Sequence, residues 1–351
     1  MAWVANAGTA YRRGSFDNGW LILEAQMKYA RMRRMAAVVS AGLCGALLLS
    51  IAGAQSWPSR PIKIVTTSPG SLGDTFGRLM APKLGERLGQ PVVVENRSAA
   101  GGGRITIAAV VQSAPDGYTF LIIPNTITSV PAVVKNPGFA PGDLTPVSFL
   151  GSGMMGLVVN ASVEANSVAE FVALARANPG KMSYGSSGIG GVHHLTMEAF
   201  LQEKGLSMVH IPYPSASPLL SDITSGRTEA LFYTLNVLIP HAKSGKVRVL
   251  AVVGDNRSPL LPEVPSTREA GVPTLDNPWV GLFAPGKTPN DIISRMHREV
   301  NSIVVGPEIR DRMAPLAITV TTLTQPEFVR FVQTDFERWK KVAATSNIVA
   351  D

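Results

Sequence analysis

The loop Gly185–Gly191 carries residues whose types and spacing could perform chemistry. It reads GSSGIGG and leads into a helix predicted to begin near His193. Serine hydroxyls, glycine N–H groups and a helix N-terminus are the donors that bind a carboxylate. Charge-assisted hydrogen bonds contribute about 1.5–3 kcal/mol each, so a few well-aimed donors outweigh a macrodipole effect of about 0.3–1 kcal/mol. The loop therefore predicts a ligand cradle, and its candidate contacts are Ser186, Ser187, Gly188 and His194.

Two other interpretations of this loop stay open. A serine-esterase elbow has the pattern Gly-x-Ser-x-Gly, and here Ile189 stands at the last glycine. Ser187 with His194 would supply a nucleophile and a base, but no clearly placed acid completes a triad. The loop could also be a plain turn in which His194 only caps the helix. The alternatives to a ligand cradle are thus a serine hydrolase and a structural turn.

The stretch Ile62–Arg78 has the same arrangement earlier in the chain. It reads IKIVTTSPGSLGDTFGR, which predicts a buried strand, a glycine-bearing loop and a helix with Asp74 as its N-cap. In open parallel sheets, ligands bind beyond the carboxyl ends of the strands, where such a loop lies. An ordinary βα turn is the alternative. The candidate ligand contacts here are Ser68, Pro69, Gly70, Ser71, Leu72 and Asp74.

Weaker candidates follow other predicted strands. Asn125 and Thr126 follow one strand, and Thr234 follows a later one. Tyr213 stands between two prolines after a strand, so it could pack on a ligand or fill an interface, and we favour ligand contact. These loops hold neither paired carboxylates nor a cluster of metal-ligating residues. We therefore expect no catalytic residue, no metal and no cofactor.

The strands and helices that position these loops alternate along the chain, which is typical of an α/β fold with doubly wound sheets. The extended stretch Val147–Asn160 is predicted to cross from one lobe to another, and Trp279–Phe283 is predicted to be a second crossing strand. We expect lobe 1 to comprise 55–155 and 283–351, and lobe 2 to comprise 156–282. Two crossings predict a hinged pair of lobes with a ligand cleft between their strand-end loops.

Residues 1–54 have the pattern of a leader. A charged segment from Met27, an apolar stretch Met35–Ile51 and small residues before Gln55 predict a cleaved signal peptide at 27–54. A membrane anchor is the alternative, because the apolar stretch approaches a spanning length. Cleavage after Ala54 would remove Cys44, the single cysteine, and with it any disulfide or thiol nucleophile.

The leader also holds most of the positive charge. Residues 1–54 contain six basic and two acidic side chains, so the net charge of +7 falls to about +3 when they are removed. The remaining chain has no basic track with interleaved aromatic residues. We therefore expect no nucleic-acid partner.

Stretches along the whole remaining chain resemble the Bug family of periplasmic solute receptors, the substrate-binding components of tripartite tricarboxylate transporters. They are Trp57–Ile62, Leu88–Arg97, Ala114–Thr119, Pro179–Lys181, Tyr184–Gly188, His194-Leu195, His210–Tyr213 and Leu282–Pro285. The resemblance implies a two-lobe periplasmic binding protein of type II topology, a Venus flytrap, that closes on a small carboxylate held by both glycine-bearing loops. It also implies export to the periplasm and delivery of the ligand to membrane permease subunits.

The chain departs from the family pattern in its first loop. Thr66–Asp74 is one residue shorter than usual, and Leu72 stands where glycine is common. A narrower pocket follows, and the identity of the acid stays open. We expect a monomeric receptor without enzymatic activity, and a ligand sensor without a transport role is the remaining alternative.

Overall fold

The structure is a computed structural model that describes residues 27, 29, 31, 32, 57–97, 103–272 and 275–349. Residues from Trp57 to Asp351 form one compact unit, distinct from the unit Met1–Ser56. In the leader, residues 27, 29, 31 and 32 are helical and exposed, and the predicted cleavage site after Ala54 lies outside the described residues. Within the described part of the chain, no helix is long and apolar enough to cross a membrane.

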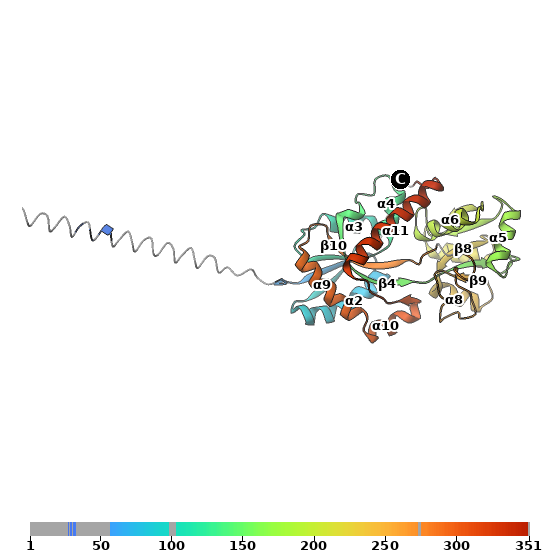
Figure 1. Cartoon of the computed structure of the whole chain (residues 1–351). Coiled ribbons are helices and arrows are strands. Elements are labelled where there is room, and N and C mark those ends of the chain that lie inside the picture. Colours follow the sequence, from blue (N-terminus) through green and yellow to red (C-terminus); the bar gives the residue numbers. More distant parts are fainter. Residues whose placement is uncertain are drawn as a thin grey trace, which may run out of the picture. The chain divides into compact units, whose positions relative to one another are not determined.

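The first sheet has six strands in the order β11-β4-β10-β3-β1-β2 (Figure 1). β1 runs parallel to both of its neighbours, whereas β10 runs antiparallel to β3 and β4, and β11 runs antiparallel to β4. β10 therefore joins the parallel half of the sheet to the antiparallel half. The strands are β1 (Ile62–Thr66), β2 (Val92–Asn96), β3 (Thr119–Pro124), β4 (Leu144–Gly153), β10 (Trp279–Pro285) and β11 (Ile318–Thr319).

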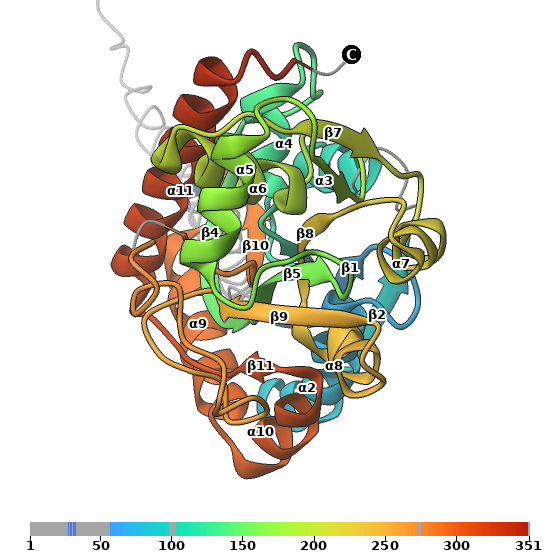
Figure 2. The same cartoon turned by 90° about the vertical axis from the view of Figure 1, so that its right-hand side faces the viewer.

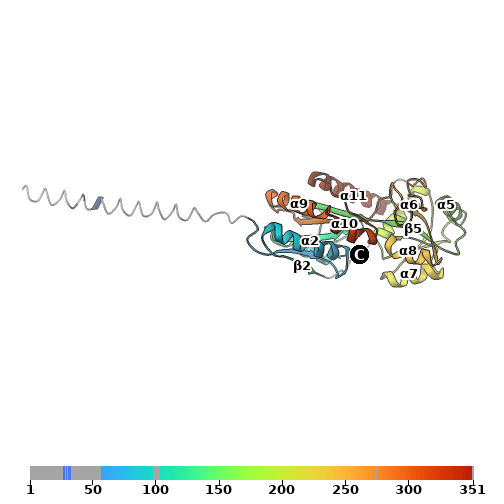
Figure 3. The same ribbon diagram turned by 90° about the horizontal axis from the view of Figure 1, so that it is seen from below.

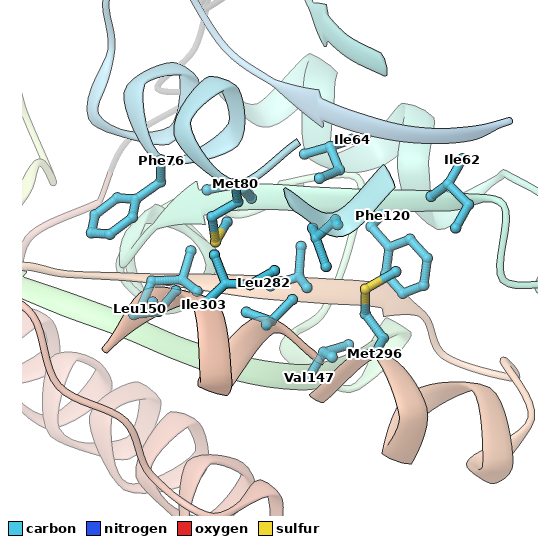
Figure 4. Close-up of a cluster of buried hydrophobic side chains, with 14 of the residues drawn as sticks. Ile62, Ile64, Phe76, Met80, Phe120, Val147, Leu150, Leu282, Met296 and Ile303 are labelled. Carbon is cyan, nitrogen blue, oxygen red and sulfur yellow. The ribbon is translucent and has the colours of Figure 1, made fainter. Parts of the chain in front are cut away.

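Helices cover both faces of this sheet, because its strands place apolar residues alternately on either side. In β3, Phe120 and Ile122 join one core, and Leu121 and Ile123 join the other. Figure 4 shows the first core, where Phe76 and Met80 of α2 lie on the sheet with Met296 of α9. This core contains residues of α2 (Leu72–Leu88), α9 (Asn290–Val304) and α10 (Pro307–Met313). The opposite core contains residues of α3 (Arg104–Val111), α4 (Thr126–Val133) and α11 (Gln325–Thr345).

The second sheet has five strands in the order β7-β6-β8-β5-β9 (Figure 2). Its two faces are likewise covered, one by α5 and α6 and the other by α7 and α8. Its strands are β5 (Met155–Asn160), β6 (Ser183–Ser186), β7 (Val209–Pro212), β8 (Ala230–Thr234) and β9 (Val247–Val252). Its helices are α5 (Val168–Ala177), α6 (Val192–Lys204), α7 (Ala216–Ser225) and α8 (Leu235–Lys243). Short 3-10 turns lie at Pro141–Asp143 and Ala314–Leu316.

The chain passes between the sheets at Met154, and again between β9 and β10. The sequence predicts one continuous strand over Val147–Asn160, but the structure divides it into β4 and β5. The break has a local cause: the Met154 N–H donates to Ala317 O at 2.9 Å, and the Met154 carbonyl accepts from Leu235 N at 2.9 Å. The whole of β10 pairs within the first sheet, so Trp279–Leu282, which the sequence analysis placed in lobe 2, belongs to the first sheet.

Helix α11 contacts helices of both lobes (Figure 3). It packs on α4, and its end contacts α6 of the second lobe. There, Gln202 Nε2 donates to Val342 O at 2.9 Å. In the middle of α11, the buried carboxylate of Asp335 accepts hydrogen bonds from Thr128 of α4 and from Trp279 of β10. The returning C-terminal segment thus belongs to the first lobe and also touches the second.

Candidate ligand-binding site

The first glycine-bearing loop joins β1 to α2. The predicted N-cap, Asp74, is wrong by three positions, because Ser71 caps the helix and its Oγ accepts from Asp74 N at 3.2 Å. Ser71 N in turn donates to Ser68 O at 3.1 Å, which closes the turn. Leu72 packs against the core of the first lobe, and Pro69 is exposed. Hydrogen bonds within the loop therefore close the turn before α2.

Asp74 organises this loop from inside. Its buried carboxylate accepts from Gly70 N, Arg78 Nε and Asn96 Nδ2, each at 2.9 Å. Burial alone would raise the pKa of Asp74, but the hydrogen bonds from Arg78, Gly70 and Asn96 outweigh it and lower that pKa. The carboxylate is thus ionised, and its hydrogen bonds to Gly70, Arg78 and Asn96 all lie within the first lobe. It fixes the conformation of the loop and places a negative charge at the start of α2.

Unused donors lie beside this loop. Within the described residues, nothing accepts from the N–H groups of Leu72 and Gly73 in the first turn of α2. At the start of α4, Asn125 is only 2% exposed and its Nδ2 has no partner among those residues. Thr126 begins α4, and its Oγ1 is 3.4 Å from Pro124 O. Of these two predicted positions, only Asn125 thus has a buried side-chain group without a partner among the described residues.

The second glycine-bearing loop joins β6 to α6. Gly191 is the N-cap of α6 without a side-chain hydrogen bond, and the first turn holds no acidic residue. In the described part of the chain, no acceptor is bonded to the N–H groups of Val192, His193 and His194. Ser187 is exposed at this end, and Gly188 is half-buried. A helix N-terminus with unpaired N–H groups and no competing carboxylate is suited to an anion.

Behind the loop, three rings form a stack. The His194 and His210 rings lie 3.8 Å apart at 9°, and Tyr184 lies 4.9 Å from His210. His194 Nδ1 accepts from Gly190 N at 3.0 Å, while Ser186 Oγ lies 2.7 Å from His210 Nε2. Burial lowers the pKa of both histidines to about 4, and proximity to His194 adds to the effect on His210. The stack is neutral at pH 7.

Ser187 contacts His193, whereas the hydrolase alternative pairs it with His194. Ser187 Oγ lies 2.7 Å from His193 Nδ1, and the His193 ring stacks on Tyr233 at 4.3 Å. His194 is bonded to Gly190 instead. Among the described residues, no carboxylate accepts a hydrogen bond from His193, and its surroundings lower its pKa to about 4 by desolvation. The pair lacks the acid that orients the base in a triad.

The remaining predicted contacts lie beside the same loop. Tyr213 N donates to Ser186 O at 2.9 Å, so this residue adjoins the loop. Its hydroxyl, however, donates to Asp222 Oδ2 at 2.9 Å and lies 2.7 Å from Thr228 Oγ1. Thr234 is the N-cap of α8 and makes no side-chain cap bond. A contact of Tyr213 with ligand would therefore use its ring rather than its hydroxyl.

Within each lobe the predicted residues follow neighbouring strands of one sheet, and one contact links the second loop to the first lobe. A Cβ added at Gly190 would lie 2.3 Å from Val133 Cγ2 at the end of α4. That the loops Ser68–Asp74 and Gly185–Gly191 face each other across a cleft stays a prediction. In the part of the chain that the structure describes, no group of His, Cys, Asp and Glu is arranged to hold a metal.

The structure adds His193 and His210 to the surroundings of the second loop, and neither is among the contacts predicted from the sequence. His210 could have been found from pairing, because parallel β6 and β7 place it opposite Tyr184 and near Ser186. Three buried hydroxyls without described partners were also missed, and no local signal distinguishes them. They are Thr66, Ser129 and Thr196.

Two hollows lie away from these loops. A groove of about 570 Å³ runs along α2 and β2 and is lined by Arg78, Pro82 and Val93 among others. A second of about 220 Å³ lies where β4, β10 and α11 meet, next to Trp279 and Phe331. Neither of these two hollows includes a predicted ligand contact, so neither supports the predicted site, and support for it comes from donor geometry.

Comparison with known proteins covers most of the chain. The sequence profile of the "Tripartite tricarboxylate transporter family receptor" matches residues 76–348. Protein BugT of Bordetella pertussis is 31% identical over 319 residues, which are 89% of this chain and 97% of that protein.

Solved structures extend the similarity to the fold. R. palustris Rpa4515 with adipate is 31% identical with a TM-score of 0.70, over 84% of this chain and 99% of that one. MatC (Rpa3494) from Rhodopseudomonas palustris with bound malate is 26% identical with a TM-score of 0.67, over 82% and 99%. The predicted two-lobe fold is thereby confirmed.

Proposed function

Because the chain belongs to the tripartite tricarboxylate transporter receptor family, we propose that it is a periplasmic receptor that captures a small organic acid between its lobes and delivers it to membrane permease subunits. The observation that carries the proposal is the pair of serine- and glycine-bearing loops, each leading into a helix whose first N–H groups are unpaired within the described residues. Adipate and malate, present in the related structures, are carboxylates of the size that such donors suit.

The two helix N-termini differ in their fitness for an anion. α2 already has the ionised Asp74 in its first turn, and Ser71 caps it. α6 has neither an acidic residue in its first turn nor a side-chain cap, and Ser187 is exposed beside it. Like charges repel, so a ligand carboxylate is expected to be held chiefly at α6, with hydroxyl and amide groups of the first lobe completing the site.

A thermal-shift screen tests the proposal. Adipate, malate, other dicarboxylates, tricarboxylates, aromatic acids and amino acids are compared with adipamide, which has the length of adipate without its charge. A ligand present at 100 times its dissociation constant adds about 2.7 kcal/mol to the free energy of unfolding. We expect at least one acid, and no neutral analogue, to raise the melting temperature. No shift with any acid would count against a carboxylate receptor.

Ser187→Ala tests the position of the site. Loss of one hydroxyl donor to a charged ligand is expected to cost about 1–3 kcal/mol, or roughly 5- to 150-fold in dissociation constant. Ser244→Ala is the matched control, since Ser244 is exposed and its hydroxyl donates only to His241 O among described groups. Calorimetry with the acid found in the screen measures both variants. Equal affinity of Ser187→Ala and wild type would place the carboxylate elsewhere.

The hydrolase alternative rests on the Ser187–His193 contact and has a direct test. Wild type and Ser187→Ala are incubated with chromogenic esters. We expect no turnover by either protein, because the pair has no described acid partner and the relatives are receptors. Turnover by wild type that Ser187→Ala abolishes would favour the hydrolase.

The proposal also includes delivery of the bound acid to membrane permease subunits. Deletion of the gene in the native cell should abolish uptake of the identified acid, and Ser187→Ala should reduce uptake at limiting concentrations. Normal uptake with a lost transcriptional response to the acid would favour a sensor.

The receptor is expected to be a monomer, which size-exclusion chromatography with light scattering measures.

A further inference from the structure

We propose that His194 is a positioning residue of the ligand loop, and that its unprotonated Nδ1 holds the Gly190 end of the loop in place. The inference rests on the proposed function, in which the loop Gly185–Gly191 contacts the ligand. It differs from direct ligand contact by His194, because the imidazole acts through the backbone of Gly190.

The contact between His194 and Gly190 carries the inference. Gly190 N donates to His194 Nδ1 at 3.0 Å, and His194 is only 5% exposed. Gly190 has a φ of +74°, which L side chains rarely adopt, and it lies against Val133 of the first lobe. The imidazole therefore fixes a backbone turn just where the loop of one lobe packs on a helix of the other.

His210 holds the other end of the same loop. Ser186 Oγ donates its single proton to Gly188 O at 3.0 Å, so it accepts from His210 Nε2, 2.7 Å away. The two imidazoles stack at 3.8 Å, which joins both ends of the loop in one assembly. His210 uses a protonated nitrogen and His194 an unprotonated one, so the two residues respond differently to acid.

Protonation of His194 would replace the acceptor at Nδ1 with an N–H group facing the N–H group of Gly190. The groups around the ring are His210 of β7, Tyr184 of β6 and Glu198 of α6. The Tyr184 hydroxyl donates to Glu198, and burial together with Glu198 raises the pKa of Tyr184, so this hydroxyl stays protonated. The ring stacked on His194 is an imidazole, and the Glu198 carboxylate is bonded to the Tyr184 hydroxyl rather than to His194. Acid is therefore expected to release the loop.

The size of the effect follows from linkage. Burial lowers the pKa of His194 from 6.5 to about 4, so a release of the loop that lets water reach the ring would raise this pKa towards 6.5. The released state then binds more protons, so the equilibrium for release rises as pH falls, by up to about tenfold per pH unit between 6.5 and 4.

Amide hydrogen exchange of the full chain, resolved on peptides spanning 185–191, tests this without a ligand. After correction for intrinsic exchange rates, wild-type protection should fall towards pH 4. His194→Leu removes the acceptor, so its loop should be unprotected at every pH. His194→Asn keeps an oxygen near Nδ1 and cannot titrate, so its loop should be protected with no dependence on pH. His241→Asn, on α8, is the control and should match wild type.

Three results would overturn the inference: wild-type protection that ignores pH, His194→Leu with a protected loop, or His194→Asn with the wild-type pH dependence. Circular dichroism checks folding, and His194→Asn alone still decides if His194→Leu does not fold. Calorimetry with adipate and malate at pH 7 and pH 5 separates the two proposals. Binding of neither acid alongside the expected exchange pattern would weaken the carboxylate proposal and leave the role of His194 standing.

Discussion

Asp335 is the buried carboxylate at which α4, β10 and α11 meet, and Asp335→Asn is expected to destabilise the first lobe. Its Oδ2 accepts from Thr128 Oγ1 at 2.6 Å, Trp279 Nε1 at 3.0 Å and Trp339 Nε1 at 3.1 Å. Its Oδ1 pairs with the guanidinium of Arg338. Asparagine has nearly the same shape, so the change removes charge without opening a cavity.

The magnitude follows from those contacts. A hydrogen bond to a charged group is worth about 1.5–3 kcal/mol and a neutral one about 0.5–1.5 kcal/mol, so three bonds to Oδ2 lose about 1 kcal/mol each. The new amide N–H group would also face Arg338, and breaking a buried ion pair costs about 3–5 kcal/mol. Both figures describe the loss of the same charge and do not add, so we expect a loss of about 3–5 kcal/mol in the free energy of unfolding, a large part of a typical total of about 5–15 kcal/mol.

Urea unfolding at pH 7, followed by circular dichroism and tryptophan fluorescence, measures this loss. Glu337→Gln is the matched control on the same helix, because the Glu337 carboxylate is 66% exposed and lies 3.6 Å from Lys340. The control should change stability by less than about 0.5 kcal/mol. If Asp335→Asn were no less stable than Glu337→Gln, the view of Asp335 as the junction of these elements would be refuted.

Four further predictions follow from other features. The free energy of unfolding should fall as pH drops from about 6.5 to 4, because buried His194 and half-buried His210 stay neutral when folded and bind protons when unfolded, at up to about 1.4 kcal/mol per pH unit for each. Asp74→Asn should destabilise at pH 7, and its difference from wild type should vanish in acid, because the stability from a carboxylate with a lowered pKa is complete above its unfolded pKa of about 3.9 and is lost as pH falls through the lower folded pKa. N-terminal sequencing of exported protein should begin at or near Gln55. Small-angle scattering should show a smaller radius with a saturating acid than without it.

Each of these has a contrary outcome. Urea curves that coincide at pH 7 and pH 5 would contradict the burial of neutral histidines, and a constant Asp74→Asn effect down to pH 2 would contradict an ionised Asp74. A product that keeps Met35–Ile51 in the membrane would show an anchor rather than a cleaved leader. An unchanged radius with bound ligand would count against hinge closure.

Local signals allowed many strands and helices and the two glycine-bearing loops to be predicted. The βα unit at Ile62–Arg78 is visible because an apolar run, turn residues and helical periodicity follow one another. The N-cap at Ser71 could also have been predicted from the sequence, because Ser71 stands three residues before the acidic Asp74, the spacing of a capping box. Errors of this kind are small, because competing caps differ by only a few residues.

The partners of the histidines were beyond local reasoning. His194 meets His210 only because β6 and β7 are neighbours in the sheet, an order that no local pattern specifies. Likewise, Thr128 and Asp335 are 207 residues apart, and nothing near either of them indicates the other. Networks of buried polar groups depend on tertiary packing. Local patterns therefore predicted the loops but not the side-chain contacts that stabilise them.

The position of β10 has a consequence for the order of folding. β10 lies between β3 and β4, yet it begins at Trp279, more than a hundred residues after both. Every strand of the second sheet, by contrast, falls within Met155–Val252. During synthesis from the N-terminus, all strands of the second sheet are made before β10, the strand at the centre of the first sheet. The second lobe can therefore nucleate from a continuous segment, while the first must close a loop that spans the second, which makes its assembly the slower event.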